Sequence, residues 1–283
     1  MIIAVTGATG AFGRLVLADL STRVPADHLV AVVRDPDRAA DLAAQGIDVR
    51  QAPYDDLEAL TTAFTGVDQL LFVSGSEVGR RVAQHANVVR AAVGAGVGQV
   101  TYTSAPHASD TTLVLAPEHK ATEELITGSG LRWTILRNNW YSENYASTLA
   151  SVTETGRLVG AAGEGRVASA ARADYAAGAA AVLTTEGHEG VVYELGGDTA
   201  WTYADLAGDL ASALGRPVEY VSVSAAELDA ELTAAGLDEQ TRGFLVALDV
   251  NVAEGTLAEV TGQLSTLIRR PTTPLLSTLK GLA

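Results

Sequence analysis

Two hydrophobic patterns alternate along the first half of the chain. Short, almost wholly apolar runs are typical of strands that are buried on both faces of a sheet. Between them lie longer segments whose apolar residues recur every three to four positions, as in amphipathic helices. The expected strands are 2–6, 28–33, 48–51, 69–73, 99–103 and 132–136, and the expected helices are 12–21, 36–45, 57–64, 80–95 and 118–127.

This alternation predicts an α/β fold, a Rossmann-type doubly wound parallel sheet with helices on both faces. Since no Pro-, Gly- or Ser-rich linker follows, we expect a Rossmann domain at 1–150 and a small α/β C-terminal lobe at 151–283. This lobe is expected to pack on the first domain and not to fold independently. Its expected strands are 157–161, 191–195 and 218–223, and its expected helices are 172–183, 202–214 (with Thr202 as N-cap), 225–235 and 238–248.

A glycine loop separates the first expected strand from the first expected helix. Gly7, Gly10 and Gly13 follow the spacing G-x-x-G-x-x-G. Glycine permits positive φ and lets the backbone approach a pyrophosphate, while the helix N-terminus offers N–H groups and a partial positive charge. Glycines also build plain turns, but the strand before and the helix after favour dinucleotide binding. The residues of this loop expected to bind the cofactor are Gly7, Thr9, Gly10, Ala11, Phe12 and Gly13.

The end of the second expected strand indicates which nicotinamide cofactor is used. Arg34 lies about 20 residues after the glycine loop, where an arginine accommodates the 2′-phosphate of NADP and an acidic residue binds the ribose of NAD. Arg34 therefore favours NADPH, with help from Arg38. The alternative is that Arg34 only pairs with Asp35 or Asp37 at the surface, and that Asp35 only caps the helix beginning at Pro36. If Asp35 reached the ribose instead, NADH would be preferred.

Composition and charge narrow the function. The 283 residues are 47% hydrophobic and carry a net charge of −15, so a large core is expected and general nucleic-acid binding is not. The absence of cysteine excludes thiolate chemistry and Cys-ligated metals, and no histidines have metal-ligand spacing. No apolar stretch is long enough to span a membrane, and the start reads as a strand, so a cytoplasmic protein is expected.

Polar residues at the ends of the other expected strands complete the candidate site, because ligands bind at the carboxyl ends of parallel strands. Val73, Ser74 and Ser104 are expected to contact the nicotinamide ribose. Asp55 is expected to meet the adenine, or else to cap the helix at residue 57. The expected substrate contacts are His107, Asn138, Asn139, Trp140 and Tyr141, of which Trp140 is equally compatible with core packing.

Several longer stretches resemble the NmrA-like atypical short-chain dehydrogenases, close to the bacterial type 2 NAD(P)H:quinone oxidoreductases. They are 131–145 with the sequence Leu-Arg-Asn-Asn-Trp-Tyr, 160–175, 187–202 and the Arg-Pro-Thr-Thr-Pro at 270–274. The resemblance implies hydride transfer from NADPH to a quinone. Asn139 departs from the family pattern, which usually has glycine at this position. An acceptor other than a simple quinone is therefore also compatible with the sequence.

The chain lacks the tyrosine of the Tyr-x-x-x-Lys pair that protonates the product in typical short-chain dehydrogenases. Lys120 is the candidate lysine, but Ala116 stands four residues before it. Quinone reduction yields a hydroquinone anion, a much weaker base than an alkoxide, so it needs this acid less. Lys120 either contacts the nicotinamide ribose as the candidate catalytic residue or pairs with Glu123 or Glu124 on the surface.

Two other functions remain compatible with these residues. One is a non-catalytic dinucleotide sensor that signals through a protein partner. The other is a tailoring enzyme that reduces a large aromatic polyketide quinone for a partner oxygenase. A homodimer is also compatible with the sequence, which does not specify the oligomeric state.

Overall fold

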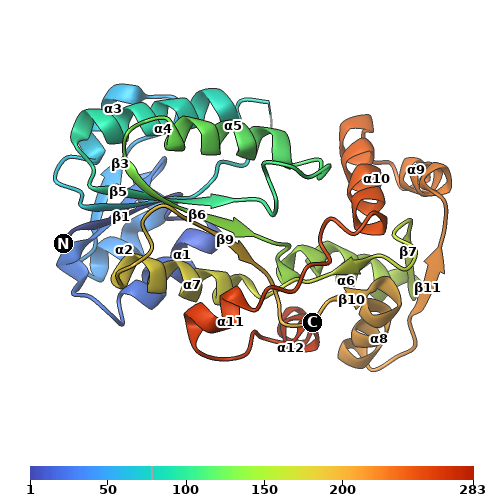
Figure 1. Cartoon of the computed structure of the whole chain (residues 1–283). Helices are drawn as coiled ribbons and strands as arrows, with labels where there is room; N and C mark the ends of the chain where they lie inside the picture. Colours follow the sequence, from blue (N-terminus) through green and yellow to red (C-terminus); the bar gives the residue numbers. More distant parts are fainter. Residues whose placement is uncertain (78) are drawn as a thin grey trace. The chain divides into compact units, whose positions relative to one another are not determined.

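A seven-stranded sheet with the order β3-β2-β1-β4-β5-β6-β9 forms the centre of the first part of the chain (Figure 1). The structure is a computed structural model that describes residues 1–77 and 79–283. The registers from β3 to β6 are parallel, and β9 continues them, since Gly190 N donates to Trp133 O and Asn139 N to Leu195 O. The strands are β1 (Ile3–Thr6), β2 (Leu29–Val33), β3 (Asp48–Gln51), β4 (Gln69–Phe72), β5 (Gln99–Ser104), β6 (Arg132–Asn138) and β9 (Val191–Leu195).

Helices cover both faces of this sheet, which confirms the predicted doubly wound α/β fold (Figure 1). One face packs on α3, α4 and α5 through a buried core that includes Phe64, Phe72 and Tyr102. The opposite face is covered by α1, α2 and α7. The helices are α1 (Ala11–Leu20), α2 (Ala40–Ala44), α3 (Leu57–Ala63), α4 (Arg81–Ala95), α5 (Ala116–Thr127) and α7 (Arg172–Thr184), with short 3₁₀ turns η1 (Ala26–His28) and η2 (Pro36–Ala39).

The strand order creates a switch point at β1. From β1 the chain moves outward through β2 and β3, and then returns to pair β4 against the other edge of β1. Connections on the two sides of a switch point diverge, which opens a crevice at the carboxyl ends of the strands. The glycine loop starts there, directly after Thr6.

A second compact unit contains two small two-stranded sheets. In one, β8 (Arg166–Val167) pairs antiparallel with β10 (Trp201–Thr202), and in the other β7 (Arg157–Gly160) pairs parallel with β11 (Glu219–Ser222). Its helices are η3 (Ser142–Tyr145), α6 (Ala146–Thr155), α8 (Tyr203–Leu214), α9 (Ala225–Ala234), α10 (Glu239–Ala253), α11 (Gln263–Ile268) and α12 (Leu275–Leu282).

The two units interleave along the sequence. The first consists of Met1–Ser109, Pro117–Asn138 and Tyr175–Glu194, and the second of Asp110–Ala116, Asn139–Asp174 and Leu195–Ala283. The chain therefore crosses between units several times, whereas the sequence suggested one boundary at residue 150. Most of α7 and β9, expected in the C-terminal lobe, belong to the first unit.

The predicted strands and helices are present in the structure with somewhat different bounds, and some bounds differ where polar residues are buried. Thr202 caps α8 in a capping box with Asp205, as expected. Helix α10 continues five residues past its expected end, because Asp249 and Asn251 are buried instead of marking a solvent-facing end. Strand β6 likewise continues through Arg137 and Asn138. Sequence patterns did not predict η3, α6, α11, α12 or the short strands β8 and β10. Among the described residues, no helix has the length and apolar character needed to cross a membrane.

A buried carboxylate anchors the Arg-Pro-Thr-Thr-Pro segment in the second unit. Asp174, with no exposed surface, accepts hydrogen bonds from Thr273 N at 2.6 Å and Thr273 Oγ1 at 3.2 Å. Arg270 forms an ion pair with the same carboxylate at 2.6 Å. Next to it, Asp198 and Thr272 exchange two backbone–side-chain hydrogen bonds at the surface.

We expect Asp174→Ala to lower the free energy of unfolding by about 3 kcal/mol, because it leaves the partly buried Thr273 N–H without its acceptor and breaks the ion pair with Arg270. Asp198→Ala removes an exposed acceptor from the same segment and should cost about 1 kcal/mol. Urea unfolding of both variants measures the difference. Equal losses would contradict the anchoring role of Asp174.

Candidate functional site

A cleft of about 480 Å³ lies at the carboxyl ends of β1 to β4, within the first unit. Four loops contribute to it, one after each of these strands. Almost all side chains that line it follow a strand end, as the switch-point geometry requires. Its lining comprises Gly7, Thr9, Gly10, Ala11, Phe12, Gly13, Val32, Arg34, Asp35, Arg38, Ala52, Pro53, Tyr54, Asp55, Val73, Ser74, Gly75, Ser76, Glu77 and Gln84.

The glycine loop lines this cleft with backbone. Gly7 has φ +58°, a left-handed conformation that favours glycine, and its carbonyl accepts from Gly10 N at 2.9 Å. Gly10 is the N-cap of α1 and offers no side chain to the first N–H groups of the helix. A Cβ at Gly13 would lie 2.4 Å from Gly7 O, so the loop and helix pack closely only with glycine there. These features fit the pyrophosphate of a dinucleotide.

Thr6 holds the ends of β1 and β4 together beside the loop. Its Oγ1 accepts from Val73 N at 3.0 Å and from the Tyr54 hydroxyl at 2.6 Å. The Tyr54 oxygen is also 2.6 Å from Val73 O. Burial raises the pKa of Tyr54, so its phenol stays protonated and bonded to both strands. Tyr54 comes from the end of β3 and completes the cleft wall.

A buried layer beneath the cleft fixes the loop after β4. The Nε2 of His85 accepts from Gly75 N at 2.9 Å, and Arg81 Nε donates to Gly75 O at 2.7 Å. Arg81 also pairs with Glu118 at 2.8 Å, and Glu118 accepts from Gly79 N. Burial, with a smaller effect of the Arg81 charge, lowers the pKa of His85 to about 3. The neutral imidazole is the form that can accept the Gly75 N–H.

Charged side chains surround one end of the cleft. Arg34 Nη1 lies 3.4 Å from Glu77 Oε1, and Arg80 bridges Glu77 and Asp55 at 2.9 and 3.0 Å. Asp35 accepts from Asp37 N and so caps η2. Arg34 therefore pairs with neither of the neighbouring aspartates suggested by the sequence. The alternative in which Asp55 caps α3 is also wrong, because Asp56 is the N-cap.

Ser104 and Lys120 are the two proposed cofactor contacts that do not line the cleft. Ser104 is buried and donates to Glu123 Oε1 at 2.5 Å. Lys120 is exposed on α5. Glu123 pairs with Arg137 at 2.6 Å, so the proposed surface pair between Lys120 and Glu123 does not form among the described residues. A role for Lys120 in catalysis stays a prediction.

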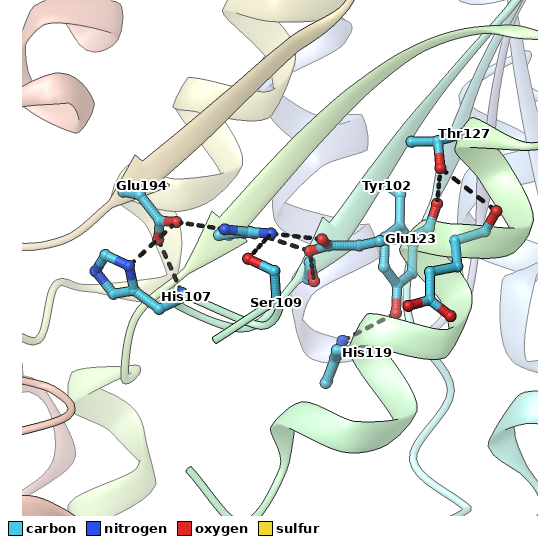
Figure 2. Close-up of polar contacts among 10 residues, drawn as sticks. Tyr102, His107, Ser109, His119, Glu123, Thr127 and Glu194 are labelled. Carbon is cyan, nitrogen blue, oxygen red and sulfur yellow. Dashed lines mark hydrogen bonds and ion pairs between the residues drawn. The ribbon is translucent and has the colours of Figure 1, made fainter. Parts of the chain in front are cut away.

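Figure 2 shows an ion-pair cluster that includes Glu123 and Glu194. Ser104 joins this cluster through its hydrogen bond to Glu123. Arg137 pairs with Glu123 and, at 2.8 Å, with Glu194, and its Nη2 donates a further hydrogen bond to Ser109 Oγ at 3.1 Å. Hydrogen bonding to these carboxylates raises the pKa of Arg137. This cluster explains how β6 continues past its apolar core.

His107 lies at the edge of that cluster (Figure 2). Its backbone N donates to Glu194 at 3.1 Å, and its Nδ1 is 3.7 Å from the same carboxylate. With φ +49°, His107 holds a left-handed conformation that non-glycine residues adopt uncommonly. The imidazole of His107 is half-exposed. Its contact with a substrate stays a prediction.

The segment expected to contact the substrate begins with Asn138, which is buried at the end of β6 in the first unit. In the second unit, Asn139 is buried, donates to Leu257 O at 3.1 Å and accepts from Trp140 N at 2.7 Å. Arg172 stacks over the ring of Tyr141 at 5.2 Å. The side chain of Asn139 thus binds backbone, and contact of these residues with a substrate stays a prediction.

Several lining residues were not identified from the sequence. Tyr54, Gly75, Ser76, Glu77 and Gln84 were missed. The rule that ligands bind at strand ends identifies Tyr54 and the loop after β4. No local signal identifies Gln84, which reaches Glu77 and Asp55 from within α4.

Known proteins resemble this chain over nearly its whole length. Residues 7–186 match the NAD(P)H-binding family. Quinone oxidoreductase 2 of Escherichia coli (strain K12) is 50% identical over 273 residues, 96% of each chain. The crystal structure of NADPH-dependent quinone oxidoreductase from that species, complexed with NADPH, has a TM-score of 0.96 with 48% identity, and 99% of each chain is covered. Triphenylmethane reductase of Citrobacter sp., complexed with NADP(H), has a TM-score of 0.94 with 39% identity, covering 99% of this chain and 100% of the other.

Gly13→Ala should weaken dinucleotide binding by about tenfold or more, because relieving the overpacked Cβ costs about 1–3 kcal/mol and shifts the loop. Titration of NADPH fluorescence measures the affinity. Gly208→Ala is the matched control, since this exposed position in α8 has nothing within 4 Å of an added Cβ. It should leave binding unchanged and stabilise the fold by about 0.5–1 kcal/mol. Unchanged binding in Gly13→Ala would exclude the close-packing role.

The two buried imidazoles should make the protein sensitive to acid. Burial lowers the pKa of His85 and of His119, which contacts the Tyr102 hydroxyl at 2.9 Å, to about 3. Unfolding therefore takes up protons below the ordinary histidine pKa of about 6.5, and stability is lost as pH falls from about 6.5 toward 3. Each imidazole contributes up to about 1.4 kcal/mol per pH unit.

Urea unfolding at pH 7.5 and pH 5 tests this expectation. His85→Gln keeps an acceptor for Gly75 N but cannot take up a proton, so it should lose less stability between the two pH values than the wild type. His28→Gln is the control, because His28 is the last residue of η1, directly before β2. This variant should lose as much stability as the wild type between the two pH values. If His85→Gln lost as much stability as the wild type between the two pH values, His85 would not contribute to the loss of stability in acid.

Proposed function

This chain belongs to the NAD(P)H-binding family, and we propose that it reduces a quinone with hydride taken from NADPH. The observation that carries the proposal is the glycine-lined cleft at the switch point, with Gly7, Gly10 and Gly13 at one side and Arg34 at the other. The similarity to quinone oxidoreductase 2 supports the choice of acceptor.

The cleft residues have separate parts in this function. The glycine loop and the N-terminus of α1 hold the pyrophosphate, and Arg34, with Arg38, holds the 2′-phosphate. Asp55 meets the adenine, and Val73 and Ser74, at the end of β4, border the nicotinamide ribose. NADPH, when bound, supplies the hydride.

Catalysis needs little acid–base chemistry from this chain. The position of the usual tyrosine is Ala116, which is buried at the start of α5 and has no proton to give. A quinone oxygen becomes a phenolate-like anion on reduction, a weak base that takes its proton from solvent after the product leaves the site. The protein then accelerates the reaction mainly by holding the acceptor against the nicotinamide and by excluding water. His107, Asn138, Asn139, Trp140 and Tyr141 are the residues proposed to do this, and Lys120 and Ser104 remain proposed ribose contacts.

Several of the relatives are named for the reduction of conjugated aromatic or quinone acceptors. Besides the quinone reductase, they include a triphenylmethane reductase and, at 30% identity, an NAD(P)H azoreductase from Xenophilus azovorans. These names describe different acceptors for related chains. A triphenylmethane dye is therefore the second candidate substrate.

The decisive measurement is oxidation of NADPH followed at 340 nm with the purified protein. We expect turnover with benzoquinone or a polycyclic quinone, and none without an acceptor. A triphenylmethane dye in place of the quinone tests the second candidate. Binding of NADPH without turnover of any acceptor would overturn the reductase and favour a dinucleotide sensor.

The same assay separates the remaining proposals. A preference for polycyclic quinones over benzoquinone supports a tailoring enzyme, and activity that appears only with an oxygenase present supports that partner. Light scattering of the active protein tests the proposed homodimer. We propose that the protein works in the cytoplasm, where its reductant is regenerated.

A further inference from the structure

A carboxylate faces the arginine proposed to bind the 2′-phosphate. Arg34 directly follows β2 and Glu77 follows β4, and these two strands lie on opposite sides of β1 in the sheet order. Their side chains meet across the cleft, with Glu77 Oε1 3.4 Å from Arg34 Nη1, and both line it. The pair thus spans the strand end where the glycine loop begins.

Hydrogen bonds to the second carboxylate oxygen hold Glu77 in this position. Its Oε2 accepts from Arg80 Nη1 at 2.9 Å and from Gln84 Nε2 at 3.1 Å. Arg80 and Gln84 are themselves fixed to Asp55, at 3.0 and 3.4 Å. The carboxylate is therefore part of a connected network and not a free surface side chain.

The acidic side chains at this end of the cleft make it less favourable for a phosphate than Arg34 would be by itself. Three acidic side chains line the cleft (Asp35, Asp55 and Glu77), against two basic ones (Arg34 and Arg38). A 2′-phosphate and the Glu77 carboxylate accept hydrogen bonds from the same guanidinium group. The phosphate is also repelled by the negative charge of Glu77, whereas the 2′-hydroxyl of NADH carries no charge.

We propose that Glu77 is a specificity-determining residue that lowers the preference of this cleft for NADPH over NADH. By competing with the 2′-phosphate for Arg34, its carboxylate brings the affinities of the two cofactors closer together and lets the protein use both. The inference rests on the proposed dinucleotide function, but it does not depend on which acceptor is reduced.

The test compares two nucleotides that differ by one phosphate. Adenosine 2′,5′-bisphosphate and adenosine 5′-monophosphate are titrated calorimetrically into the wild type and Glu77→Gln. An exposed ion pair such as that between Arg34 and Glu77 contributes an interaction that corresponds to a change of up to about fivefold in affinity. We expect Glu77→Gln to bind the bisphosphate about fivefold more tightly and to bind the monophosphate with less than twofold change. The ratio of the dissociation constants for NADPH and NADH should shift in the same direction.

Two controls isolate the contact between Arg34 and Glu77. In an Arg34→Ala background, Glu77→Gln should give less than half of the gain for the bisphosphate. Asp37→Asn removes a charge beside the end of β2 from a residue that has no ion pair among those described, and it should leave the ratio within about twofold of wild type. Equal tightening of both nucleotides by Glu77→Gln, or no change, would overturn the inference.

The outcome is separable from that of the proposed function. A wild-type protein that binds neither nucleotide would overturn both the cofactor assignment and this inference. A protein that binds both but reduces no quinone would overturn only the proposed reaction, and the nucleotide ratio would still decide the role of Glu77.

Discussion

The cleft depends on how the hydroxyl of Thr6 joins two strands. The connections that follow the paired strands β1 and β4 diverge at the switch point, so the backbone just after β4 lacks a partner in β1. Thr6 Oγ1 accepts the Val73 N–H, and Tyr54 bonds to both Thr6 and Val73 O. These bonds hold the end of β4 beside the start of the glycine loop. A valine at position 6 would preserve the strand but leave Val73 N without this acceptor.

The central sheet was predictable because its signals are local. Apolar runs mark the buried strands, and the spacing of Gly7, Gly10 and Gly13 marks the turn into α1. What sequence patterns missed depends on contacts between distant residues. Arg137 looked like the polar end of a strand, yet it is buried because Glu123 and Glu194 neutralise it. The pair between Arg34 and Glu77 likewise joins residues whose proximity follows only from the strand order.

The buried polar groups of the first unit have structural partners. Ser104 donates to Glu123, Tyr102 contacts His119, and His85 supports Gly75. These buried groups hold backbone and side chains in place. Polar side chains in the core of the first unit therefore fix its shape, including the loop that carries Gly75 into the cleft.

The interleaving of the two units sets an order of events during synthesis. Every residue that lines the cleft lies before residue 85, so all of them leave the ribosome early. The first unit nevertheless stays incomplete until Tyr175–Glu194 emerges, since this segment supplies most of α7 and β9. Asp174 waits longer still, until Thr273 has also been synthesised. The nascent chain thus carries an unfinished sheet edge through much of its synthesis, the stage at which exposed strands are most open to aggregation and chaperone binding.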